Sequence, residues 1–238
     1  MPLLWCNSRF AKACLVPIFI LLAVVSLIGA ETGIAAQEEQ RALKFRWAFG
    51  ALSGEGNSKK LEPVTQDRPL KSGDRLKMLV ELEQKCFVYL VHQNPQGELR
   101  LLFPYKLEQF NSDYEVARQY YVPKGNTWFE LDAARGQESF YLLASGDRLS
   151  GLETLLAQYD AGDAVSKPDL AKQVVAEIRN LRKQARELST PAERPVTIGG
   201  AIRGLEKPKE QNAPDLAALA QEISATGFYA KTFTIDHQ

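Results

Sequence analysis

Hydrophobic and polar side chains alternate along several short segments of this chain, and the alternation predicts β-strands. It begins at residues 43–49, where Leu43, Phe45 and Trp47 are interleaved with polar or small residues, and it recurs at residues 76–82. A period of two places one set of side chains on the buried face of a sheet and the other on the opposite face. We therefore predict a strand in each segment, with a loop over residues 53–73 between them.

The strongest strand signal lies at residues 86–93, which are dense in β-branched and aromatic side chains. Residues 94–97 (Asn-Pro-Gln-Gly) have the composition of a tight turn, and residues 99–103 provide an apolar return strand, so the segment predicts a β-hairpin. Further strands are predicted at residues 120–122, 128–131 and 139–144. The mixed, polar segment 105–119 is predicted to be a loop over the sheet.

Helical periodicity replaces this alternation in the last third of the chain. Ser150 and Glu153 have the spacing of a capping box and predict the start of a short helix. Residues 169–189 repeat apolar side chains at spacings of three and four, which predicts a longer helix with one apolar stripe. A last short helix is predicted over residues 214–223, followed by a strand at residues 228–235, which must pair with the earlier sheet because a lone strand is unstable.

These elements together predict an α+β fold. We expect an antiparallel β-sandwich or small barrel-like sheet, with two or three C-terminal helices packed on it and a final C-terminal strand rejoining the sheet. Residues 43–149 would form a β-rich domain. Residues 150–238 would be a helical extension with a C-terminal strand, part of the same globular unit.

The N-terminus has the residue order of a secretory signal sequence. Arg9 and Lys12 precede an apolar run over residues 15–28, and small residues ending at Ala36 follow it. We predict that residues 1–36 are a signal peptide and that residues 37–42 are a short tether, so that the domain is exported to the periplasm or cell envelope. The alternative is an uncleaved leader that anchors the chain to the inner membrane, because the run approaches the roughly 17–25 residues that a span needs.

Charge and cysteine content narrow the possible partners. The chain has 29 basic and 29 acidic residues, so it has no bulk attraction for phosphate backbones, and nucleic acid is a poor partner. After loss of the leader, only Cys86 remains of the three cysteines. This rules out an internal disulfide and favours a buried, unreactive thiol in an apolar strand. A membrane contact is expected only through the leader, if the leader is uncleaved.

Several motifs in the middle of the chain resemble one known family. They are the Gly73-Asp74 turn, the aromatic strand Phe87-Val88-Tyr89-Leu90, and Gly97 followed by Leu102-Phe103-Pro104. In this order they resemble the DUF4384 family, a bacterial domain of unknown function, over roughly residues 70–146. The resemblance implies an exported or envelope-associated β-rich module, often joined to other domains. It implies no established chemistry, and the family has no need of the extension that follows Leu149.

No set of residues predicts catalysis, a cofactor or a metal ion. The two histidines, His92 and His237, fall at a strand end and near the chain terminus, and a zinc site usually needs three or four ligands. A Ser-His-Asp triad assembles in three dimensions, so spacing does not decide it, but no Gly-x-Ser-x-Gly elbow is present. We therefore expect no catalytic, cofactor-binding or metal-binding residues and no cofactor.

Aromatic side chains in and beside the segment 105–128 are the candidates for partner binding. Aromatic side chains in loops on a β scaffold bind glycans or peptides in some proteins. More often they cover the edge of the hydrophobic core. The candidates are Tyr105, Tyr114, Tyr120, Tyr121 and Trp128. We expect a non-enzymatic binding module whose partner is an envelope protein or polymer. The alternatives are an unrecognised hydrolase that uses His92 or His237, and a tethered structural component.

Overall fold

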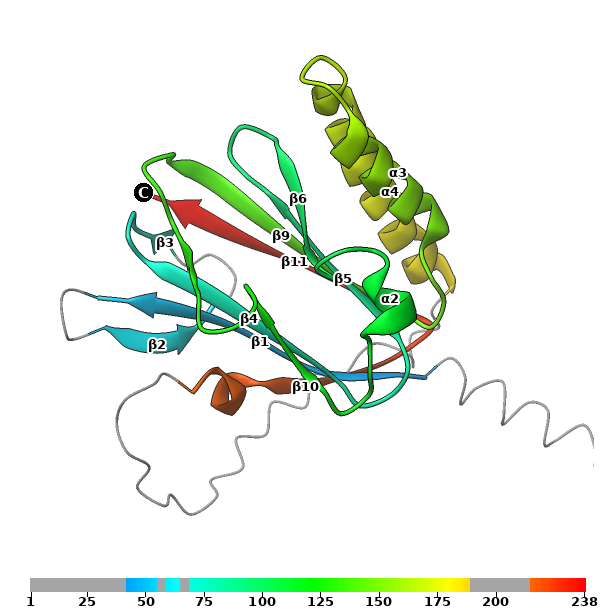
Figure 1. Cartoon of the computed structure of the whole chain (residues 1–238), viewed down its shortest axis with the longest axis horizontal. Coiled ribbons are helices and arrows are strands. Elements are labelled where there is room, and N and C mark those ends of the chain that lie inside the picture. The colour runs from blue at the N-terminus through cyan, green and yellow to red at the C-terminus, as the bar shows by residue number, and fades with distance from the viewer. Residues whose placement is uncertain (1–41, 55–58, 65–68, 189–214) are drawn as a thin grey trace, which may run out of the picture. The chain divides into compact units, whose positions relative to one another are not determined.

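The computed structural model describes residues 42–54, 59–64, 69–188 and 215–238. They belong to one compact unit, Arg41–Gln238, which contains two β-sheets and flanking helices (Figure 1). The predicted signal peptide and all but the last residue of the predicted tether lie outside the described residues. No helix in the described part of the chain is long and apolar enough to cross a membrane.

The first sheet, which we call sheet A, has six strands. They are β1 (Ala42–Ser53), β2 (Lys60–Pro63), β4 (Arg75–Leu82), β7 (Gln119–Val122), β8 (Phe129–Glu130) and β10 (Gln221–Thr226). The main path runs β10-β1-β4-β7, with β2 paired to β1 and β8 paired to β4. Every ladder in sheet A is antiparallel. The first half of β1 alternates because one face of the sheet meets the core and the other is less buried, whereas β4 is buried at most positions.

The second sheet, sheet B, has five strands in the order β3-β11-β9-β5-β6. They are β3 (Pro69–Leu70), β5 (Phe87–Gln93), β6 (Leu99–Phe103), β9 (Gly136–Ser145) and β11 (Phe228–His237). Its ladders are antiparallel, with the exception of the short β3–β11 pair, which is parallel. The predicted hairpin and the predicted return of the last strand to the sheet are both confirmed.

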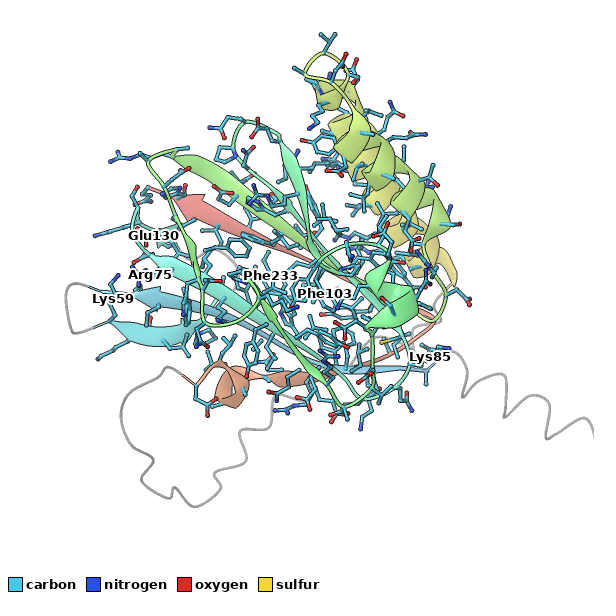
Figure 2. All side chains as sticks on the ribbon, viewed as in Figure 1. Lys59, Arg75, Lys85, Phe103, Glu130 and Phe233 are labelled. Atoms are coloured by element: carbon cyan, nitrogen blue, oxygen red, sulfur yellow. The ribbon has the colours of Figure 1, made fainter. Side chains whose placement is uncertain are left out.

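The main hydrophobic core lies between the two sheets. Alternate side chains of β1 and β4 meet the inner side chains of β5, β9 and β11, and all of them are almost fully buried. Phe49 packs edge-on against Phe140 and Phe233, with ring centroids 5.0 and 5.4 Å apart. Figure 2 shows Phe103 and Phe233 in this interior. The sheets remain separate, so the fold is an α+β sandwich and not a closed barrel.

Helices cover the outer face of sheet B (Figure 1). They are α2 (Gln109–Ser112), α3 (Ser150–Ala161) and α4 (Lys167–Leu188). Buried side chains of α3 and α4, such as Leu152, Val174 and Ile178, pack on Tyr89 and Leu143 of the sheet. This second core explains why β5 and β9 are apolar on both faces, whereas β1 alternates.

A smaller cluster covers part of the outer face of sheet A. There the 3-10 helix η3 (Leu216–Leu219) places Leu216 against Ala48 of β1 and Leu79 of β4. Gly50 makes this close approach possible, because a Cβ there would lie 2.6 Å from a methyl group of Leu216. A side chain at this point of β1 would require the methyl groups of Leu216 and Leu61 to move.

Two predicted loops contain secondary structure. Residues 53–73 include β2 and β3, and residues 105–119 include the single turn of α2. β2 is polar and β3 has two residues, so neither shows periodicity. Their existence depends on pairing with β1 and β11, which lie far away in the sequence.

Two predictions about helix ends are wrong. Leu149 is the N-cap of α3 and makes no side-chain cap hydrogen bond, and Glu153 instead binds Arg148 and Tyr89. The predicted helix over residues 214–223 is limited to η3, and Ile223 lies in β10, where it pairs with Phe45. Residues 221–226 pair with β1 along its edge. The hydrogen bonds of this ladder override the weak helical spacing of Leu216, Leu219 and Ile223.

Candidate functional site

A pocket of about 290 Å³ lies at the side of the sandwich between edge strand β6 of sheet B and the β8 end of sheet A. Residues on β4, β5, β6, β8 and β9 and on the adjoining turns line it. They are Leu76, His92, Asn94, Pro95, Gln96, Glu98, Leu99, Arg100, Leu102, Phe129, Glu130, Leu131, Asp132, Ala134, Glu138 and Phe140. Most of this wall is built on paired strands and a tight hairpin, so it is positioned by the sheets.

A histidine–carboxylate pair forms part of the pocket lining. His92 Nε2 is hydrogen-bonded to Glu138 Oε2, and the imidazole packs on the ring of Phe140 with centroids 4.6 Å apart. His92 is directly opposite Phe140 in the β5–β9 ladder, so Glu138 is its diagonal neighbour on the same face. Glu138 is only 6% exposed, which makes it a buried acid on the inner side of the pocket.

The register of β6 brings a cation to the same lining. A bulge opposite Leu90 and Val91 shifts the pairing, and His92 then lies opposite Arg100. Cross-strand partners share a face, so Arg100 is on the pocket side of the sheet. The lining thus has four carboxylates and one guanidinium: Glu98, Glu130, Asp132, Glu138 and Arg100.

Each of the three outer carboxylates has a partner within the protein. Glu130 forms an exposed ion pair with Arg75 at 3.0 Å, and Figure 2 shows the two side by side. Glu98 accepts a hydrogen bond from the Asn94 amide at 2.8 Å, and Asp132 accepts one from the Ala134 N–H at 2.7 Å. Of these partners only Arg75 is a cation, so the pocket remains acidic.

Serine, threonine, cysteine and lysine are absent from the lining given above, so its possible nucleophiles are carboxylates and the His92 imidazole. Within the described ranges, no group of three His, Cys, Asp or Glu side chains is arranged to hold a metal ion. The pocket thus offers carboxylates, an imidazole and a guanidinium for contacts with a ligand.

The second histidine lies elsewhere on sheet B. His237 pairs with Gly136 and His92 with Phe140, so the two are separated by four residues, about 14 Å, along β9. His237 is 2% exposed, and its Nε2 lies 3.1 Å from Ser72 Oγ. The structure thus brings together a serine and a histidine that sequence spacing does not connect.

The surroundings of His237 oppose a nucleophile–base role for this pair. His237 Nδ1 is buried, and it has no hydrogen-bond partner among the described residues. A buried N–H group without an acceptor is rarer in proteins than a buried acceptor without a donor. We therefore place the proton of the neutral imidazole on Nε2, which donates it to Ser72 Oγ, and leave Nδ1 as the unpaired acceptor. In that tautomer the imidazole cannot take the hydroxyl proton of Ser72, as a serine hydrolase requires.

Three of the five aromatic candidates lie in a cluster at the edge of the core. The ring centroids of Tyr105, Tyr114 and Tyr120 lie 5.7, 6.0 and 5.3 Å from that of Phe103. Burial raises the pKa of Tyr105 to about 12 and raises that of Tyr114 well above its usual value. The Tyr114 hydroxyl accepts the Val88 N–H at 2.9 Å. These tyrosines support the loop that carries them.

The other two candidates enclose a lysine on sheet A. Lys77 Nζ lies 5.5 Å from the ring centroid of Tyr121 and 5.4 Å from that of Trp128. It donates hydrogen bonds to the carbonyls of Gly125 and Thr127 at 2.6 and 2.9 Å. Burial lowers the pKa of Lys77. The two aromatic rings already contact a cation of this chain, and the contact fixes the turn before β8.

Two features were not predicted as functional from sequence. The His92–Glu138 pair joins residues 46 positions apart, and an internal network joins Tyr89, Arg148 and Glu153. The sequence signal for the first was His92 itself, a polar residue near the end of the apolar strand β5. Cys86 is buried, as predicted, and burial raises the pKa of its thiol to about 12.

Comparison with known families gives one match. Neither the curated proteins nor the solved structures contain a match to this chain. The family match spans β3 to β9 and includes the whole pocket lining given above, but it does not include β1, β10 or β11. It agrees with the motifs at the Gly-Asp turn, the aromatic strand and the hairpin. Residues 69–148 of this chain thus match DUF4384, a domain of unknown function.

Proposed function

We propose that this chain is an exported, non-enzymatic binding module of the bacterial cell envelope, and that the pocket between β6 and β8 is its binding site. The signal-sequence pattern of residues 1–36 supports export, and the DUF4384 resemblance supports an envelope location. The observation that carries the binding role is the pocket itself. It has apolar walls and a few converging polar groups, which is the composition of a ligand site.

The other surfaces considered from sequence support binding less well. Tyr120 is 3% exposed and belongs to the core, so its replacement by alanine would test folding and not recognition. Tyr121 and Trp128 already contact Lys77. The apolar stripe of α4 is used internally, since Val174 and Ile178 pack on sheet B. The pocket is a concave site among the described residues that none of these contacts fills.

Site-specific crosslinking in cells tests this proposal. A photo-reactive amino acid replaces Gln96, an exposed residue of the pocket lining, in a tagged full-length chain. The same amino acid at Gln173, on the exposed side of α4, is the matched control. We expect an envelope component to be captured from position 96 and not from position 173.

The same sample reports the fate of the leader. Mass spectrometry of the purified protein would show a mature start at Gln37 if the leader is cleaved, and an intact N-terminal peptide if the chain is tethered. Equal capture from both positions, or capture from neither, would contradict binding at the pocket. A cytoplasmic protein as the captured partner would contradict the envelope location.

One observation favours a hydrolase as the second candidate. Glu138 orients the His92 imidazole through Nε2, and such a pair can activate a water molecule. Turnover of ester or phosphate substrates by the purified protein, lost in His92→Gln while the thermal melt is kept, would favour this alternative. Turnover that His92→Gln leaves unchanged would exclude His92 as its base.

A further inference from the structure

We infer that the pocket accepts a cationic group at the end of an alkyl chain, an ammonium or a guanidinium. This inference rests on the proposed function, because it names the ligand chemistry of the same pocket. The group could belong to a basic side chain of a bound peptide or to a free alkylamine, which share this chemistry. Charge, hydrogen bonding and wall composition each support it.

The innermost carboxylate has unused capacity. The Glu138 side chain is 8% exposed, and its Oε2 is bound to His92. A carboxylate has two oxygens with about four lone-pair sites, so the bond to His92 leaves Glu138 able to accept a further donor from the pocket. A charged donor forms the strongest such hydrogen bond.

The outer carboxylates repel anions and attract cations. Glu98, Glu130 and Asp132 surround the pocket with Glu138, whereas Arg100 is the one guanidinium of the lining. No ion pair joins Arg100 to these acids within the described segments. Arg100 therefore does not neutralise the carboxylates of the lining, and the pocket keeps a negative charge that attracts cations.

The walls suit an alkyl stem between the cation and the solvent. Leu76, Phe129 and Leu131 line the side of sheet A, and Leu99, Leu102 and Phe140 line the side of sheet B. A pocket of about 290 Å³ is at the small end of ligand sites, which span roughly 300–1,000 Å³. It has room for one long side chain, whose methylenes contact apolar walls while its charged end reaches a carboxylate.

Titration followed by NMR tests the inference directly. The protein starting at Gln37 is titrated with agmatine and butylamine, and with butanol and butyrate as uncharged and anionic analogues. We expect saturable shifts of the amides of Glu98–Arg100 and Phe129–Asp132 with the two cations only. Saturable binding of butyrate or butanol with equal or higher affinity would overturn the inference.

Matched variants assign the binding to the pocket. Glu138→Gln keeps the shape and removes the charge, and we expect it to weaken agmatine binding at least tenfold. Asp132→Asn, on the exposed rim of the pocket, should weaken agmatine binding several-fold. This variant tests the assignment if Glu138→Gln does not fold. Glu222→Gln is the control, because Glu222 binds Lys44 on the outer face of sheet A. Equal affinity in all three variants would contradict the assignment.

The experiments distinguish a peptide side chain from a free amine as the source of the cation. They also distinguish failure of the cation site from failure of the binding module. Tighter binding of the peptide acetyl-Ala-Lys-Ala-amide than of butylamine indicates a protein partner, and the reverse indicates a free amine; either supports a cation site. If no cation binds but Gln96 still captures an envelope component, the cation inference is wrong and the binding module stands. If both experiments fail, both proposals are wrong.

Discussion

The side chain of Glu153 connects helix α3 to strand β5 of sheet B. Its carboxylate accepts hydrogen bonds from the Tyr89 hydroxyl at 2.5 Å and from Arg148 Nη2 at 2.6 Å. The Tyr89 hydroxyl in turn accepts the Leu149 N–H at 3.0 Å. Burial disfavours the charged form of Glu153, but the bonds from Arg148 and Tyr89 outweigh it, so the pKa is lowered. A residue expected to cap a helix thus fixes the helix to β5.

The lowered pKa of Glu153 predicts a pH-dependent contribution to stability. The contribution is complete above the ordinary pKa of 4.5 and is lost as pH falls through the lowered folded-state pKa, because protonation is more favourable in the unfolded chain. We expect Glu153→Gln to lower the free energy of unfolding at pH 7, and the difference from the wild type to shrink toward pH 3. Urea unfolding at both values measures it.

The control for this experiment is Asp169→Asn. Asp169 pairs with Lys172, but both side chains are 77% exposed, so the change should have little effect at either pH. A gap between Glu153→Gln and the wild type that stays constant from pH 7 to pH 3 would contradict the role given to the ionised carboxylate.

A close contact with the hairpin turn restricts which residue can occupy position 136 at the start of β9. Gly136 has φ of +138°, and a Cβ there would lie 2.8 Å from Cβ of Pro95, which lines the pocket. Both the backbone conformation and the space exclude a side chain. This contact joins the hairpin turn, which lines the pocket, to the start of β9.

Gly136→Ala is therefore expected to destabilise the protein by about 1–3 kcal/mol, through strain and displacement of the turn. Thermal unfolding measures the loss. Gly227→Ala separates the two causes, since Gly227 has a positive φ of +73° but open space around it. Equal losses in the two variants would show that the contact with Pro95 contributes nothing.

Elements with internal periodicity were predictable, and elements that depend on a partner were not. The strands at β1, β4, β5, β9 and β11 were visible because alternation or dense apolar composition is a property of the segment itself. β3 and β10 were missed, since a two-residue strand and a segment with helical spacing are strands only when β11 and β1 are beside them. The predicted capping box of Ser150 and Glu153 is absent for the same reason, because Tyr89 and Arg148 bind the Glu153 carboxylate instead.

At the scale of the whole molecule, the family match does not coincide with a complete sandwich. Residues 69–148 supply β3 to β9, but β1 lies between β10 and β4, and β11 lies between β3 and β9. The outer face of sheet B also depends on α3 and α4 for its cover. The segments outside the match therefore complete both sheets.

We expect a protein of residues 69–148 alone not to fold. Loss of β11 removes the ladder partner of β9 and β3, and loss of the helices exposes Tyr89, Val91 and Leu143. The fragment should give a poorly dispersed amide spectrum and no cooperative melt, whereas residues 37–238 should show both dispersion and cooperativity. A well-dispersed spectrum from the fragment would show that the added strands are dispensable.

Sequence by itself determined the fold class, the hairpin, the return of the last strand and the resemblance to DUF4384, because each depends on residues close together or on a local motif. Tertiary structure alone decided the pocket. His92 and Glu138 are 46 residues apart, and Glu130 reaches the same lining from the other sheet. Their meeting depends on sheet order, on the register of β5 and β9 and on the bulge in β6, and no local pattern of side chains encodes pairing between distant strands.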